Sequence, residues 1–117
     1  MKAINKQKGY ITSQTILQTV STARTLAAQK RTLITVCPTD NKTSCSSSGR
    51  YILTKSTDEV LACQPLSFNT TYRGFPQYQY PTYEPSGYSK TNGRFVTNHY
   101  AVILAYGGHP RIETRSS

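Results

Sequence analysis

Residues 33–45 read LITVCPTDNKTSC, and within this stretch the pattern of the chain changes from helix to strand. In the preceding residues 13–29, apolar side chains recur at the spacing that stacks them on one side of an α-helix. They are Ile16, Val20, Ala23 and Ala27. From residue 33 to residue 36 the apolar and β-branched residues are instead consecutive, as in a buried strand. The stretch therefore predicts an amphipathic helix that leads into a β-rich remainder.

The side of the predicted helix opposite its apolar stripe is polar but uncharged. It carries Gln18, Ser21, Thr25 and Gln29. A solvated helix face usually carries charged residues, so this face could lie against neighbouring subunits. An ordinary surface helix in a protein with few acidic residues explains the pattern equally well.

Short strand patterns alternate with turn residues in the middle of the chain. We expect strands over residues 32–36, 51–54, 60–63 and 66–69. Residues 69–91 resist such an assignment, because three prolines exclude a central strand and the segment is crowded with tyrosines. We expect a long ordered loop or a ragged sheet edge there. Tyr78 and Tyr80 could stack on nucleic-acid bases, but sealing the sheet edge is the preferred interpretation.

The last part of the chain reads as a hairpin and two further strands. Asn92-Gly93 predicts a type I′ turn between two short strands, because this turn needs two positive φ angles. Residues 100–106 are nearly all apolar and predict a central strand. Residues 111–114 predict an edge strand with Ile112 facing inward.

The order of features across residues 16–45 is helix, short apolar strand, Cys-Pro, polar loop and a second cysteine. In this order the chain resembles the globular domain of the GspH/FimT group, which comprises minor pseudopilins of type II secretion and minor pilins of type IV pili. The resemblance implies an α+β, pilin-like fold: one domain over residues 1–117, with residues 1–9 as a flexible start. It also implies an N-terminal membrane helix that this sequence lacks, so we interpret Met1 as an artificial start. The full-length protein would be extracytoplasmic, held in the inner membrane before assembly into a pilus or pseudopilus.

Three cysteines allow one disulfide and leave one thiol. Cys37 and Cys45 are the preferred pair, because turn-forming residues between them could bring the two ends within bonding distance. A bridge between Cys45 and Cys63 is the alternative. In the preferred pairing, Cys63 is a free thiol that packs as a small hydrophobe in an apolar strand.

Charge and motifs narrow the range of functions. The chain has 14 Lys and Arg residues against 5 Asp and Glu residues, a formal net charge of +9, which favours anionic partners. No nucleophile motif or phosphate-binding loop is present, and few carboxylates are available for acid–base work, so we expect no enzymatic activity. His99 and His109 have no metal-ligand spacing, and we expect neither metal nor cofactor.

The candidate binding residues lie near the C-terminus. Alternation in a strand would place Arg111, Glu113 and Arg115 on one solvent face. The guanidiniums of the two arginines could bind phosphates there. An ordinary basic edge strand, with both arginines flanking the glutamate in an ion cluster, is the alternative. FimT-type pilins carry a Gly-Arg-x-Arg signature associated with DNA binding. Gly108 and Arg111 match its first and last positions, and His109 replaces its first arginine. Other cations that could extend the basic track are Lys90, Arg94 and Arg73.

Two functions follow from the resemblance. The leading hypothesis is a minor type IV pilin that binds the phosphate backbone of DNA without sequence specificity, for DNA uptake in natural transformation. The alternative is a GspH-like structural pseudopilin at the tip of a secretion filament. In both cases the N-terminal helix would contact other pilin subunits, and membrane contact would depend on the missing helix alone. Adhesion to membrane surfaces or acidic polymers is a third possibility, which predicts no preference for DNA.

Overall fold

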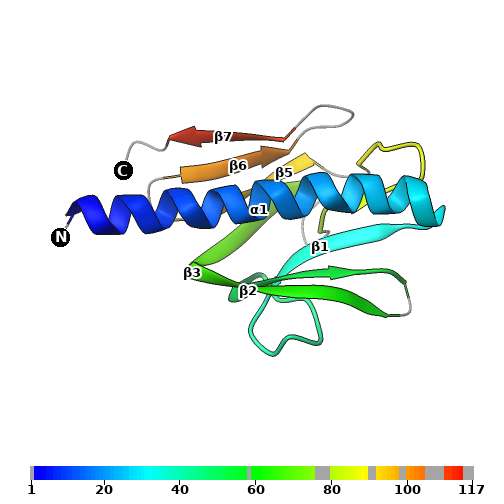
Figure 1. Ribbon diagram of the computed structural model, residues 1–117, viewed down its shortest axis with the longest axis horizontal. Coiled ribbons are helices and arrows are strands. Elements are labelled where there is room, and N and C mark those ends of the chain that lie inside the picture. Colours follow the sequence, from blue (N-terminus) through cyan, green and yellow to red (C-terminus); the bar gives the residue numbers. More distant parts are fainter. Residues whose placement is uncertain are drawn as a thin grey trace.

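Helix α1 (Lys2–Lys30) lies along one face of a seven-stranded antiparallel sheet (Figure 1). The computed structural model describes residues 2–57, 59–75, 80–89, 92–97, 100–104 and 110–114. The strands are β1 (Ile34–Thr39), β2 (Ser48–Lys55), β3 (Val60–Phe75), β4 (Thr82–Tyr83), β5 (Asn92–Thr97), β6 (Tyr100–Leu104) and β7 (Arg111–Thr114). Their order in the sheet is β4-β1-β2-β3-β5-β6-β7. The architecture is α+β, as predicted.

The apolar stripe of α1 forms the helix side of the core, as its spacing indicated. Its four predicted members are all fully buried, among them Ile16 and Ala27. The helix is longer than expected, however: it begins at Lys2, so residues 2–9 form its first turns. At 29 residues it is about 44 Å long, and β6 and β7 contact it as well as β1 and β3.

The helix ends where the chain takes a left-handed turn. Arg31 has a φ of 53°, and the amide of Thr32 donates to the carbonyl of Ala27 over 3.3 Å. This six-residue hydrogen bond around a left-handed residue is the Schellman arrangement, which satisfies a carbonyl at the helix end. It also redirects the chain into β1.

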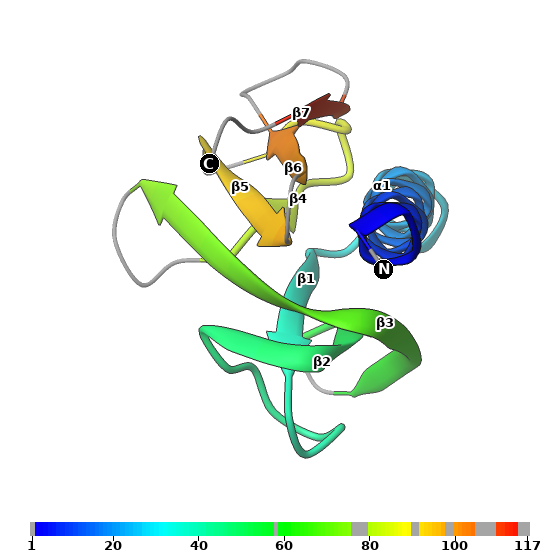
Figure 2. The same cartoon turned by 90° about the vertical axis from the view of Figure 1, so that its left-hand side faces the viewer.

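Strand β3 joins the two halves of the sheet. Two separate strands were expected over residues 60–69, but the structure has a single strand that pairs first with β2 and then with β5. In Figure 2, where α1 is seen end-on, β3 sweeps from one half to the other. Its pairing with β2 breaks near Phe68, whose amide donates instead to the hydroxyl of Thr12 on α1, over 3.1 Å. The helix thus satisfies the backbone where β3 bends.

The prediction of a hairpin turn at Asn92-Gly93 is wrong. Both residues lie inside β5, where Gly93 pairs with Gly74 of β3. The ring of Tyr72 lies over these two glycines, and a Cβ atom on either would collide with it. The glycines therefore serve a close approach between a ring and the backbone, which the sequence does not distinguish from a turn.

The sheet edges largely follow the predictions. β7 is an edge strand, and Ile112 packs against the core. The short strand β4 is the opposite edge, so the proline-rich segment does supply a ragged edge, although β3 extends further into it than expected. Tyr80 packs against the core beside Tyr72, with the ring centroids 5.7 Å apart, as a seal would; Tyr78 lies outside the described residues.

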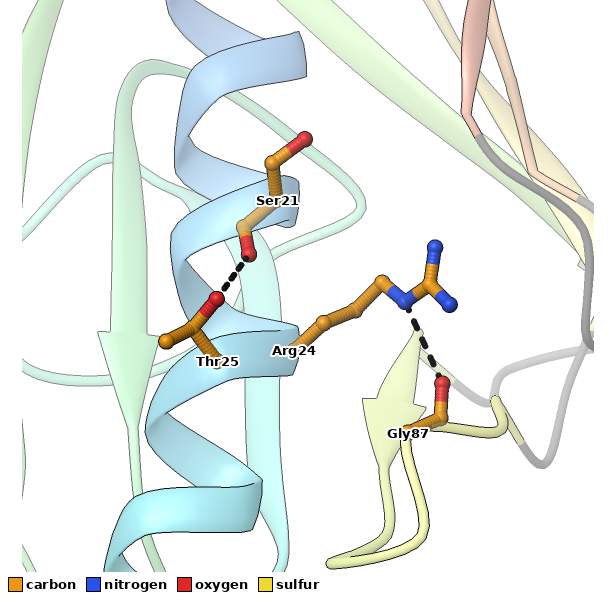
Figure 3. A pocket seen from close by; sticks show the side chains of 4 residues that line it. All are labelled: Ser21, Arg24, Thr25 and Gly87. Carbon is orange, nitrogen blue, oxygen red and sulfur yellow. Dashed lines mark hydrogen bonds between the residues drawn. The ribbon is translucent and has the colours of Figure 1, made fainter.

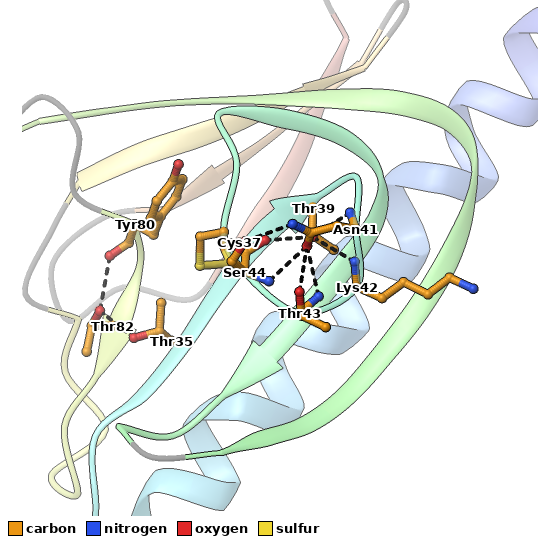
Figure 4. Close-up of a disulfide and its surroundings, with 10 residues drawn as sticks. Thr35, Cys37, Thr39, Asn41, Lys42, Thr43, Ser44, Tyr80 and Thr82 are labelled. Carbon is orange, nitrogen blue, oxygen red and sulfur yellow. Dashed lines mark hydrogen bonds between the residues drawn. A yellow bond between two sulfur atoms is a disulfide. The ribbon is translucent and has the colours of Figure 1, made fainter.

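The disulfide between Cys37 and Cys45 is present, with Cα atoms 5.5 Å apart (Figure 4). The loop that it closes is organised by Asn41, whose side-chain oxygen accepts hydrogen bonds from the amides of Thr43 and Ser44, each over 2.9 Å. Cys63 is the free cysteine, and it is partly exposed where burial was expected.

Candidate nucleic-acid interface

Three arginines lie in one line across four strands of the sheet. Arg73 of β3 pairs with Arg94 of β5, Arg94 pairs with Ile103 of β6, and Ile103 pairs with Arg111 of β7. Residues directly opposite one another in antiparallel strands project from the same face. We call Arg73, Arg94 and Arg111 the arginine row.

The arginine row is on the face of the sheet that points away from α1. The next residues along the four strands are Tyr72, Phe95, Val102 and Ile112, and these form a parallel line that belongs to or packs on the core beneath the helix. Since side chains alternate between faces, the arginines point outward, and all three are exposed. At about 4.8 Å per strand the row spans roughly 14 Å, with its first two members adjacent.

Two of the candidate binding residues lie in paired strands, although we expected them in irregular segments. Arg73 was placed in an aromatic loop and Arg94 at a hairpin turn, but both lie within paired strands. The sequence did not reveal that the two face each other, because cross-strand register depends on where β3 and β5 begin to pair. Four further candidates lie outside the described residues. They are Gly108, His109, Arg115 and Lys90.

Arg111 forms an ion pair with Glu113. Its Nε and Nη2 atoms each lie 2.7 Å from the same carboxylate oxygen, Oε2, and the two side chains keep exposed fractions of 62% and 48%. The prediction that alternation places these two side chains on one face is therefore confirmed. Arg111 forms an ion pair with Glu113 on an edge strand, as the alternative interpretation expected. An exposed pair of this kind contributes about 0–1 kcal/mol to folding.

Arg73 and Arg94 are electrostatically different from Arg111. Within the part of the chain that the structure describes, no carboxylate pairs with either of them. Like charges placed directly opposite each other in a sheet are destabilising, so this arrangement costs folding free energy. A bound anion between the two guanidiniums would remove that cost.

A further arginine lies on the helix side of the molecule. Arg24 of α1 donates from Nε to the carbonyl of Gly87 over 3.2 Å, and this contact borders an open pocket of about 340 Å³ (Figure 3). Ser21 and Thr25 complete its lining. The Thr25 hydroxyl is already used by the Ser21 carbonyl, at 3.3 Å. The contact ties the turn at residues 84–89 to the helix.

The outer face of α1 carries no charge from Gln14 to Gln29, as predicted. Its exposed positions include Gln18, Ser21, Thr25 and Gln29, and α1 contains no acidic residue at all. Tyr10 and Ile11 are also exposed, at 43% and 49%. This surface runs along the side of the molecule opposite the arginine row.

Among the described residues no group of His, Cys, Asp or Glu side chains could hold a metal ion. Over the same residues, none of the helical structure combines the length and apolar character that crossing a bilayer requires. Comparison of the chain with protein-family models, with curated proteins and with solved structures finds no match.

Proposed function

We propose that the outer face of the β3–β5–β6–β7 sheet binds DNA through its phosphates without reading its sequence, in a FimT-like minor pilin that acts in DNA uptake. The observation that carries the proposal is the arginine row. A chain of phosphates could lie across the strands and contact all three guanidiniums. Such contacts position a duplex and carry no sequence information.

Three features support this assignment over a merely solvated surface. The net charge of +9 attracts any polyanion. The row is rigid, because each arginine lies in a paired strand. It also places two cations opposite each other at a cost in stability, and a functional surface explains such a cost better than a structural one does. The row spans about four nucleotides of one strand, at 3.4 Å per nucleotide.

The test is the salt dependence of binding to a fluorescently labelled DNA duplex, measured by anisotropy. With three phosphates contacted by the row and up to five in all, log affinity should fall with log salt at a slope of about −3 to −5. Duplexes of different sequence should bind equally. Removing the three charges in R73Q/R94Q/R111Q should flatten the slope by about 2.7.

A matched control is R31Q, which removes an exposed arginine from the turn between α1 and β1. Because Arg31 lies outside the row, its loss should change the slope by less than the loss of any one row arginine. If wild-type protein fails to bind at about 50 mM salt, or if the triple variant binds as tightly as wild type, DNA binding by this face is excluded.

A structural subunit of a filament, as in a GspH-like pseudopilin, is the second candidate. The uncharged outer face of α1 favours it, because a face without charge can be buried against a neighbouring subunit at little desolvation cost. Placing two charges there in Q18K/T25K should then prevent chemical cross-linking into higher oligomers and should not weaken DNA binding. Cross-linking that is equal in the variant and the wild type would argue against this role.

A further inference from the structure

The Arg111–Glu113 ion pair occupies the part of the guanidinium that recognises phosphate best. Nε and one Nη form the edge that donates two parallel hydrogen bonds to a carboxylate or phosphate. In this structure Nε of Arg111 donates to Oε2 of Glu113 over 2.7 Å, and Nη2 lies 2.7 Å from the same oxygen. A phosphate can take this edge only if the carboxylate leaves it.

The pair is not needed to hold β7 in place. β7 is fixed by its register with β6, from Tyr100↔Thr114 to Ile103↔Arg111, and by Ile112, which packs against the core. The pair itself lies on the solvent face, where ion pairs add little to stability. The carboxylate thus has a larger effect on what Arg111 can bind than on folding.

We propose that Glu113 attenuates binding by the arginine row: its carboxylate competes with a DNA phosphate for Arg111 and so lowers the affinity of the row for DNA. The inference rests on the proposed DNA binding. The Glu113 carboxylate is attached two residues from Arg111, so it competes for the guanidinium at high effective concentration. A DNA duplex carries one charge per about 1.7 Å, and its release of counterions favours displacement of Glu113.

The first arm of the test is a double-mutant cycle with a labelled DNA duplex at low salt. E113Q should tighten binding about two- to fivefold, the range set by an exposed ion pair. It should also steepen the salt slope by a fraction of the about 0.9 that one phosphate contributes, because Arg111 then contacts the phosphate without competition. In the R111Q background the same E113Q change should produce little gain, since its effect passes through Arg111.

The second arm compares the DNA duplex with polyglutamate. Because a competitor lowers affinity most for the ligand that gains most from Arg111, E113Q should tighten binding of the duplex by at least as large a factor as binding of polyglutamate, so the ratio of duplex to polyglutamate affinity should not fall. E59Q is the matched control: Glu59 is an exposed acid in the turn between β2 and β3, and its loss removes the same charge outside the arginine row. Its effect on both ligands should be small and equal.

The outcomes separate the two proposals. If wild-type protein binds the duplex but E113Q does not improve binding, or improves it equally in the R111Q background, then Glu113 is not a competitor for Arg111. A larger gain for polyglutamate than for the duplex would overturn competition for Arg111 as the way in which Glu113 acts. No binding of DNA by any variant would overturn the proposed function itself, and this inference with it. Circular dichroism melting curves that overlay for wild type and E113Q would show that the fold is unaffected.

Discussion

At the scale of single residues, burial sets the chemistry of Tyr83. This residue is 3% exposed, in the edge strand β4, and burial raises the pKa of its phenol from 10.0 to about 12. Arg24 opposes this rise in pKa, and Tyr72 adds to it. The neutral phenol is thus favoured in the folded state over the charged one.

The raised pKa predicts a loss of stability in strong alkali. Between pH 10 and 12 the unfolded chain releases the Tyr83 proton more readily than the folded protein does, so the free energy of unfolding falls as the pH rises. The contribution of the neutral Tyr83 phenol to the free energy of unfolding is complete below pH 10 and is lost by about pH 12. It amounts to roughly 2–3 kcal/mol. Urea unfolding at several alkaline pH values should show a smaller decline for Y83F. Y88F, at an exposed position, should decline like the wild type.

At the scale of elements, the β1–β2 connection is held by covalent and close-packed contacts. The disulfide closes the loop from Cys37 to Cys45, and Gly49 of β2 lies so close to the backbone of Thr39 that a Cβ atom would collide with it. Lys42, in this loop, has a φ of 68°, and its ammonium lies 4.8 Å from the centre of the Tyr51 ring. These contacts hold the loop against β1 and β2.

Removing the disulfide should weaken the fold without touching DNA binding. A bridge with a sequence separation of 8 residues restricts the unfolded chain, and its loss in C37A/C45A should lower the free energy of unfolding by about 2–3 kcal/mol. Urea titration measures this loss. Because the arginine row is carried by other strands, duplex affinity should stay within about twofold of the wild type. A large loss of binding in a folded variant would place the loop in the interface.

At the scale of the whole molecule, the two faces of the sheet have different roles. One face is buried under α1 and contains the core around Ile16 and Phe95, while the other displays the arginine row to solvent. The core on the inner face therefore supplies the folding free energy that offsets the repulsion between the opposed charges on the outer face. This separation allows the charged face to change without loss of the fold.

It follows that neutralising one of the two facing arginines should stabilise the protein while it weakens binding. R73Q removes the repulsion with Arg94, so the free energy of unfolding should rise by up to about 1 kcal/mol and Tm by up to about 5 °C. Duplex affinity should fall in the same variant. Thermal melting and anisotropy measure the two effects, and R31Q should show neither. A lower Tm for R73Q would mean that this arginine supports the sheet.

Part of the fold could be predicted because it depends on local patterns. The helix stripe, the Cys37–Cys45 bridge and the strands expected over residues 32–36, 100–106 and 111–114, which overlap β1, β6 and β7, all follow from spacing or from short-range turn chemistry. The prediction of a hairpin at Asn92-Gly93 failed because the same dipeptide suits both a turn and a close contact beneath an aromatic ring. The start of α1 was missed because its first turns carry no apolar stripe of their own.

The amino-acid sequence alone determined the α+β class, the basic charge and the alternation of Arg111 and Glu113 along one strand, since each is a property of composition or of neighbouring residues. Only the tertiary structure decided that Arg73 and Arg94 face each other and that Arg111 completes their line. The physical reason is that register between distant strands depends on how their buried faces fit the core, and a shift of one residue would turn every one of these side chains to the other face.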